Sequence, residues 1–169
     1  MSREHGGPSA TLTRRTMSDA DGTGAPVIRE AFPYLCVRGA ARAIEFYTRV
    51  FGAVETLRLT DGQGRVGHAE LELGPVTLML ADEHPEHGIL SPLAHGGTGM
   101  RMHLHVDDVD ALARRAWDAG ATILMAPADQ AHGERQCRLR DPFGHEWLLG
   151  HPVEQLSPDE MRRRIAAEG

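Results

Sequence analysis

The sequence contains no lysine, because all 18 of its basic residues are arginine. Without a lysine amine the chain cannot form a Schiff base with a carbonyl substrate. It also lacks the lysine that phosphate-binding loops and protein kinases place against phosphate groups. These enzyme classes are therefore excluded.

Cysteine is scarce as well. The two cysteines, Cys36 and Cys137, lie about a hundred residues apart and form no CxxC pair. A disulfide framework or a structural zinc ribbon needs more cysteines at closer spacing, so we expect neither. This usage predicts a reduced compartment, the cytoplasm.

An excess of positive charge and long apolar runs are also missing. The 24 acidic residues outnumber the basic ones and give a net charge of -6, which does not attract phosphate backbones or anionic membrane surfaces. No window reaches the roughly eighteen apolar residues of a membrane-spanning helix, and the N-terminus shows no apolar stretch of a secretory signal. We expect a soluble protein that binds neither nucleic acid nor membranes.

Residues 1–29 contain no aromatic side chain, and about half of them are Gly, Pro, Ser, Thr or Asp. Such a composition cannot bury enough apolar surface to offset the entropy lost on ordering. We therefore expect a disordered leader over 1–29, with Met17 as an alternative start to Met1.

The rest of the chain predicts one domain over 30–152 in which the order strand, helix and three strands occurs twice. The first module spans about 31–82 and the second about 100–152, separated by a connector at 83–99 that is rich in Gly, Pro and His. The expected strands are 32–37, 53–60, 66–73 and 76–81, then 100–106, 122–127, 135–140 and 145–150, and the helices run from 40 to Gly52 and from 109 to Gly120.

A further helix is expected in the tail at 153–169. Ser157 is suited to its N-cap, Pro158 to its first position and Glu160 to the capping box. We thus expect the chain to end in a helical segment.

Several short motifs in this order carry a family resemblance. They are PYL at 33–35, AIEFY at 43–47, FGA at 51–53, HAEL at 68–71, DPFGHEW at 141–147 and SPDEM at 157–161. With them the chain resembles the vicinal oxygen chelate superfamily of glyoxalases, bleomycin and fosfomycin resistance proteins and extradiol dioxygenases, and more narrowly its PhnB-like branch. The resemblance implies an α+β fold, in which two βαβββ modules form a curled mixed sheet around a concave cavity, and a homodimer.

The resemblance also assigns the positions of the superfamily's metal ligands. Metal-dependent members carry a ligand on the first strand of each half and another on the last strand. These positions fall on Phe32, Arg101 and Leu148, and none of these side chains offers a lone pair to a cation. We therefore expect no metal cofactor at the usual place, and none of the activities that depend on it.

A displaced metal site stays open as an alternative. Strand alternation places Arg101, His103 and His105 on one face. Together with His68 and Glu146, His103 would give two imidazoles and a carboxylate, a chemically sensible set for a divalent metal. The other interpretation is that these side chains form hydrogen bonds in a wet cavity or at a dimer interface, since an arginine beside the ion would repel it.

The leading hypothesis is a metal-free protein that binds a small organic molecule, as in sequestration of a drug or metabolite. Arg101 carries fixed donors for an anionic or carbonyl oxygen, and Phe32 and Tyr34 would stack on the ligand. Whether the protein is an enzyme stays open. An isomerase or lyase step on a carbonyl compound would use His68 or His103 as general base. The remaining expected ligand contacts are Cys36, His105, Glu146 and Leu148.

Four other residues are expected to be structural. Asp141 shapes the turn before the last strand, with Gly144 supplying the permissive backbone angle. Trp117 and Trp147 are expected to anchor the core.

Overall fold

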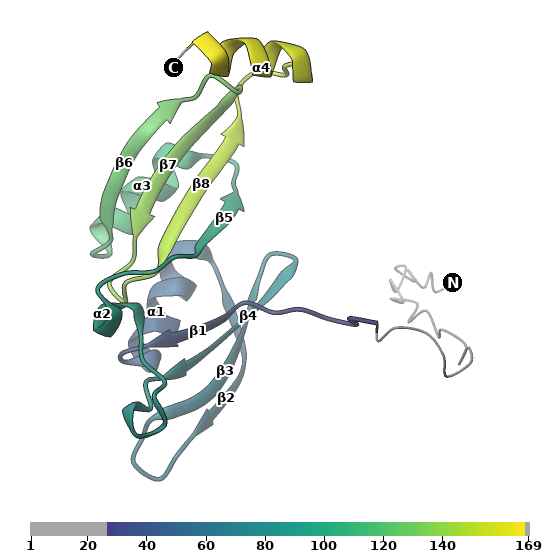
Figure 1. The fold of residues 1–169 in the computed structure, drawn as a ribbon. Helices are drawn as coiled ribbons and strands as arrows, with labels where there is room; N and C mark the ends of the chain where they lie inside the picture. The colour runs from purple at the N-terminus through teal and green to yellow at the C-terminus, as the bar shows by residue number, and fades with distance from the viewer. Residues whose placement is uncertain (1–26, 168–169) are drawn as a thin grey trace, which may run out of the picture. The chain divides into compact units, whose positions relative to one another are not determined.

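The structure is a computed structural model that describes residues 27–167 (Figure 1). The expected disordered leader and the alternative start at Met17 therefore fall almost entirely outside the described residues. Contacts divide the chain into two units, one up to Ala31 and one from Phe32 onward. The second unit contains every helix and strand discussed below.

Two βαβββ modules follow one another along this unit, which confirms the predicted α+β fold class. The first comprises β1 (Tyr34–Val37), α1 (Ala40–Phe51), β2 (Val54–Thr60), β3 (Val66–Leu73) and β4 (Val76–Asp82). The second comprises β5 (Arg101–His105), α3 (Val109–Asp118), β6 (Thr122–Asp129), β7 (Glu134–Arg140) and β8 (Glu146–Pro152). The connector holds η1 (Pro85–His87) and α2 (Pro92–His95), and the predicted terminal helix is α4 (Pro158–Ala167).

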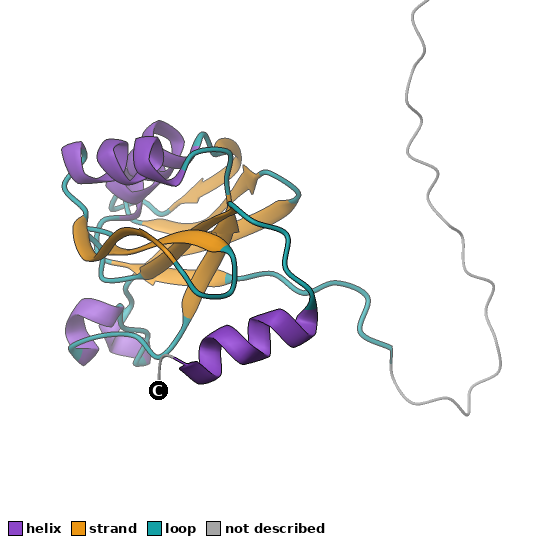
Figure 2. Cartoon of the chain, turned by 90° about the horizontal axis from the view of Figure 1, so that it is seen from above, coloured by secondary structure: helices purple, strands orange, loops and turns teal. Residues whose placement is uncertain are grey.

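Each module forms its own four-stranded mixed sheet, in the order β1-β4-β3-β2 and β5-β8-β7-β6. The first and last strands of a module are parallel neighbours, and the remaining pairs are antiparallel. The strands occupy the middle of the unit and the helices lie outside them (Figure 2). None of the described helices has the length and apolar character needed to cross a membrane.

The modules share one hydrophobic core, in which aromatic rings of α1 meet the last strand. Trp147 is fully buried as predicted, with its ring centroid 5.4 Å from that of Tyr47 and 4.5 Å from that of Phe51. The prediction for Trp117 was wrong, since this residue is 59% exposed. The buried residues of α3 form a stripe along the helix through Val109 and Ala116. Trp117 lies about 90° around the helix axis from the centre of this stripe, and so its ring faces outward.

Asp141 shapes the turn before β8, as predicted. Its Oδ1 accepts hydrogen bonds from the backbone N–H groups of Phe143 and His145, at 2.9 and 3.0 Å, and Gly144 adopts φ 93°. Its Oδ2 has a second role that the sequence did not reveal. It accepts hydrogen bonds from the Tyr47 hydroxyl and from Trp147 Nε1, both at 2.8 Å, and so joins α1 of one module to β8 of the other.

Glu83 fixes the connector to the first module. Its carboxylate accepts hydrogen bonds from Arg38 Nε at 2.8 Å and from the Ser91 backbone N–H and hydroxyl at 2.9 and 2.5 Å. The hydrogen bonds from Arg38, and then those from Ser91, lower the pKa of Glu83 from 4.5 to about 2. The folded state therefore favours the ionised carboxylate.

We expect this pKa difference to make stability depend on acid. Above pH 4.5 the carboxylate is ionised in both folded and unfolded chains and its stabilisation is fully present; it is lost as the pH falls towards about 2. Urea unfolding between pH 6 and 2.5 should show a smaller decline for Glu83→Gln than for the wild type. Glu72→Gln, at an exposed position, should retain the wild-type decline, and identical slopes in all three proteins would contradict this role.

Candidate functional site

Alternate residues of β5, β8 and β7 form the side of the second sheet that faces away from the core, with its β5 residues exposed. In β5, Met102 and Leu104 pack against the core, so the residues between them project to the opposite side. The register across the strands then defines three rows. The polar face, as we call this side, consists of the rows Arg101–Glu146–Arg140, His103–Leu148–Arg138 and His105–Gly150–Gln136, with Glu134 at the start of β7.

Positive charge dominates the first two rows. Arg140 Nη2 donates a hydrogen bond to Glu146 Oε1 at 3.0 Å, and Arg101 Nε lies 3.7 Å from Glu146 Oε2. The next row adds Arg138, whose Nε is the one buried side-chain nitrogen or oxygen without a hydrogen-bond partner among the described residues. Two guanidinium groups thus face the Glu146 carboxylate, and a third lies in the next row with its Nε unpartnered among the described residues, so donors remain available for an oxygen-bearing ligand.

The third row lies beside a group of potential metal ligands. Donor atoms of His103, His105 and Glu134 all lie within 4.8 Å of one another. His105 Nε2 and Glu134 Oε1 are 3.4 Å apart, and the two imidazole centroids are 4.8 Å apart. Two imidazoles and a carboxylate on neighbouring strands are able to bind a divalent metal.

The first sheet holds a separate polar group. The Tyr34 hydroxyl and His68 Nδ1 are 2.9 Å apart, and His68 Nε2 is 3.2 Å from Glu70 Oε1. Phe32, which precedes β1, is 43% exposed and Tyr34 is 51% exposed. These rings are therefore accessible for stacking on a ligand.

Cys36 lies in β1 beside this group and is half-buried. Burial, and then the carboxylates of Glu83 and Asp82, raise the pKa of its thiol. A raised pKa lowers the thiolate fraction at neutral pH, and the thiolate is the nucleophilic form. This environment favours Cys36 as a contact residue over Cys36 as a nucleophile.

The structure brings together some of the predicted site residues and separates others. Arg101 lies beside Glu146, and His103 lies beside His105. His68, however, belongs to the first sheet with Tyr34 and Glu70. Among the described residues, the group with donor atoms close enough for one metal ion contains His103 but neither His68 nor Glu146.

Five residues of the polar face were missing from the sequence prediction: Gly150 on β8, and Glu134, Gln136, Arg138 and Arg140 on β7. Alternation along β7 was the available indication, since Glu134, Gln136, Arg138 and Arg140 share one face of that strand. To place these residues beside the predicted site, one also needs the register of β7 against β8. The spacing of residues in the sequence does not provide that register.

A hollow of about 370 Å³ lies along α3, on another part of the surface. None of the predicted site residues lines it. Its walls are formed by Asp110, Ala113, Arg114, Trp117, Asp118, Ile123 and Pro127.

A protein-family model matches most of the second unit. The family is described as the Glyoxalase/Bleomycin resistance protein/Dioxygenase superfamily, and the match covers residues 28–149. It includes both modules apart from the last residues of β8.

Sequence relatives and solved structures agree with this match. An uncharacterized protein of Mycobacterium bovis is 41% identical over 140 residues, which cover 81% of this chain and 92% of that protein. An uncharacterized protein of Mycobacterium tuberculosis strain H37Rv is also 41% identical over 140 residues, which cover 82% of that protein. The structure of an Arabidopsis thaliana gene product is 26% identical with a TM-score of 0.62, over 74% of this chain and all of that one. The structure of TioX from Micromonospora is 28% identical with a TM-score of 0.57, over 73% of this chain and all of that one.

Proposed function

Because the chain belongs to the Glyoxalase/Bleomycin resistance protein/Dioxygenase superfamily, we propose that it binds a small organic molecule on the polar face. The ligand carries an anionic or carbonyl oxygen, and Arg101, Arg138 and Arg140 recognise it. The observation that carries this proposal is the surplus of three guanidinium groups over one carboxylate, Glu146. Planar guanidinium donors match the oxygens of carboxylates and phosphates.

The superfamily's usual metal does not fit the residues at its positions. Arg101 is a cation that already faces Glu146, and Leu148 and Phe32 have no donor atoms. A metal ion next to the Arg101 guanidinium would be repelled. The arrangement of these residues therefore supports sequestration of a drug or metabolite better than it supports the metal-dependent reactions of the superfamily.

A catalytic role is the second candidate, and the position of His103 favours it. His103 follows Arg101 on the same side of β5, at the roughly 6.6 Å spacing of alternate strand residues. An imidazole at that distance would act as general base on a carbonyl compound whose oxygen is held by Arg101. The expected reaction class is then an isomerisation or a lyase step.

We also propose that the protein is a homodimer. β2 is an outer strand of the first sheet and is exposed along its whole length, with Val54, Leu57 and Leu59 at 57%, 38% and 55% exposure. An apolar outer strand is a surface that a second copy would cover. Light scattering after size-exclusion chromatography should give twice the mass of the chain. A mass equal to one chain would contradict the proposed homodimer. Membership of the PhnB-like branch remains a prediction from the six sequence motifs, and a cytoplasmic location remains a prediction from the cysteine usage.

The ligand proposal is tested by thermal unfolding against a panel of carboxylates, 2-oxo acids, organic phosphates and anionic antibiotics. A ligand at a hundred times its Kd stabilises the fold by about 2.7 kcal/mol, a shift of several degrees. Arg101→Ala and Arg140→Ala should each weaken binding tenfold or more. Arg58→Ala, which removes an arginine paired with Glu55 on β2, should leave it unchanged. A panel without any shift, or a shift that survives Arg101→Ala, would reject the site.

A further inference from the structure

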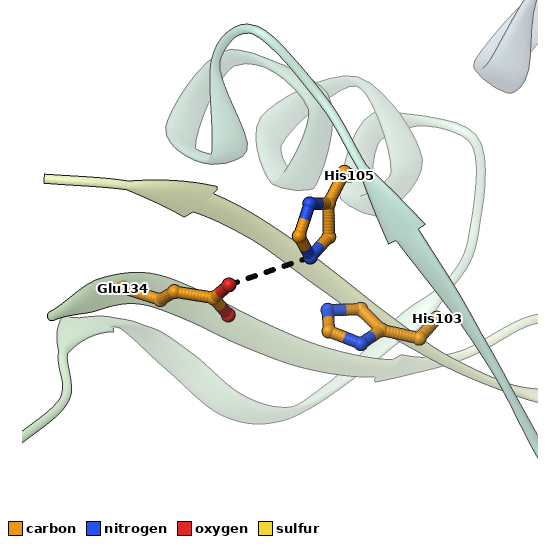
Figure 3. A group of neighbouring side chains, drawn as sticks. All are labelled: His103, His105 and Glu134. Carbon is orange, nitrogen blue, oxygen red and sulfur yellow. Dashed lines mark ion pairs between the residues drawn. The ribbon is translucent and has the colours of Figure 1, made fainter. Parts of the chain in front are cut away.

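We propose that His103, His105 and Glu134 bind one divalent transition-metal ion above Gly150. The three side chains come from β5 and β7 and point toward one another across β8 (Figure 3). This site differs from the positions that the superfamily uses for its metal. It uses none of the three arginines proposed to bind the organic ligand, although it shares His103 with the catalytic alternative.

The donor atoms need little movement to surround an ion. A metal at about 2.1 Å from each ligand places neighbouring donors about 3.0 to 3.4 Å apart. His105 Nε2 and Glu134 Oε1 are already 3.4 Å apart, and all three donors lie within 4.8 Å of one another. Rotation of the His103 side chain, which is exposed, would close the remaining gap. Three protein ligands leave further coordination positions open.

Gly150 provides a second observation that points to the same place. It lies in β8 between His105 and Gln136 in the register of the strands. A Cβ atom on Gly150 would lie 2.9 Å from His103 Nε2 and 3.2 Å from Glu134 Oε2. Gly150 is not one of the glycines with positive φ, so the backbone does not demand glycine here. Glycine instead leaves the space in which an imidazole and a carboxylate converge.

The surroundings of Glu134 prepare it as a ligand. Gln136 Nε2 donates a hydrogen bond to Glu134 Oε2 at 2.8 Å, which leaves Oε1 directed at His105. The amide of Gln136 thus orients the carboxylate from outside, as partners of metal ligands commonly do.

The ligand chemistry indicates which ions to expect. Imidazole with one carboxylate suits Zn²⁺, Co²⁺ and Ni²⁺, whereas Mg²⁺ and Ca²⁺ prefer sites made of oxygen atoms. Zn²⁺ should therefore bind in the presence of excess Mg²⁺. Arg138 lies in the neighbouring row of the polar face and opposes the ion's charge, so we expect a site that exchanges its metal readily.

The test is titration of the tag-free full-length protein with Zn²⁺ by calorimetry and with Co²⁺ by visible absorption. We expect one ion per chain, with d–d bands for Co²⁺. His105→Ala and Glu134→Gln should each weaken binding tenfold or more. Gly150→Ala keeps every donor atom, but its methyl group would fill the space between His103 and Glu134. This variant should weaken metal binding to a similar extent.

Two substitutions in the first sheet serve as matched controls. His68→Ala removes a histidine paired with a glutamate, and Gly67→Ala adds a methyl group whose closest neighbour would be Leu59 O at 3.9 Å. Both should retain wild-type affinity. Thermal unfolding without metal checks the fold of Gly150→Ala; should it not fold, His105→Ala carries the test, because that side chain is 63% exposed. The absence of Zn²⁺ binding, or binding unaffected by His105→Ala, would overturn the proposal.

Discussion

Replacing Asp141 with alanine is expected to lower the free energy of unfolding by about 5 kcal/mol. Asp141 is 4% exposed and accepts hydrogen bonds from four donors: the backbone N–H groups of Phe143 and His145, the Tyr47 hydroxyl and Trp147 Nε1. Alanine would leave these buried donors without a partner. A loss of this size equals the total stability of the least stable natural domains, about 5 kcal/mol.

Urea unfolding of three variants separates the parts of this network. Burial and the neighbouring carboxylate raise the pKa of Tyr47 well above its usual value, so its hydroxyl stays protonated and donates. Tyr47→Phe removes only this donor and should cost about 1.5 kcal/mol, which keeps the test valid if Asp141→Ala does not fold. Asp107→Ala, at an exposed position, should cost less than about 0.5 kcal/mol. A loss of less than about 2 kcal/mol in Asp141→Ala would contradict the role assigned to the buried carboxylate.

The elements of the fold were predictable because local patterns determine them. Alternation between turn residues predicted strands at 66–73 and 76–81, and the structure has β3 at Val66–Leu73 and β4 at Val76–Asp82. The helix expected from 109 to the glycine at 120 is α3, Val109–Asp118. In both cases, hydrophobic periodicity and the permissive backbone of glycine act within a few residues of the chain.

The candidate site was only partly predictable, because it depends on contacts between distant strands. Glu134 fell one residue outside the expected strand 135–140. Its approach to His105 follows from the register of β7 and β5 on either side of β8. Likewise, Arg140 and Glu146 are paired across a turn, and the pairing is visible only once the two strands are aligned. A sequence readily indicates on which face of a strand a residue lies. It does not as readily indicate which residue of a neighbouring strand that residue contacts.

The second sheet places the two proposed binding sites in neighbouring rows. The rows of the second sheet change along β5 from Arg101, beside Glu146, to His105, beside Gly150. The corresponding strand of the first sheet carries Tyr34 and Cys36. Buried positions in both modules have to fit one common core, whereas exposed positions are free to differ.

The last strand of each module also supports the start of its helix, and the two modules do so with different strength. In the first, Asp82 Oδ1 accepts hydrogen bonds from the backbone N–H groups of Gly39 and Ala40 at 2.9 and 2.8 Å, and its Oδ2 accepts one from Val66 at 2.8 Å. In the second, His151 Nδ1 accepts a single hydrogen bond from the Val109 N–H at 3.2 Å. Helix α1 has no side-chain cap at Gly39, so Asp82 replaces one.

We therefore expect Asp82→Ala to lower the free energy of unfolding by about 3 kcal/mol and His151→Ala by about 1 kcal/mol. The carboxylate satisfies three backbone donors and its charge interacts favourably with the N-terminus of α1, whereas the imidazole satisfies one donor of a helix that Asp108 also caps. Urea unfolding measures both losses, and amide hydrogen exchange should show lost protection in the first turn of α1 for Asp82→Ala alone. Equal losses in the two variants would show that the last strand holds both helices by packing, and that the carboxylate adds nothing to it.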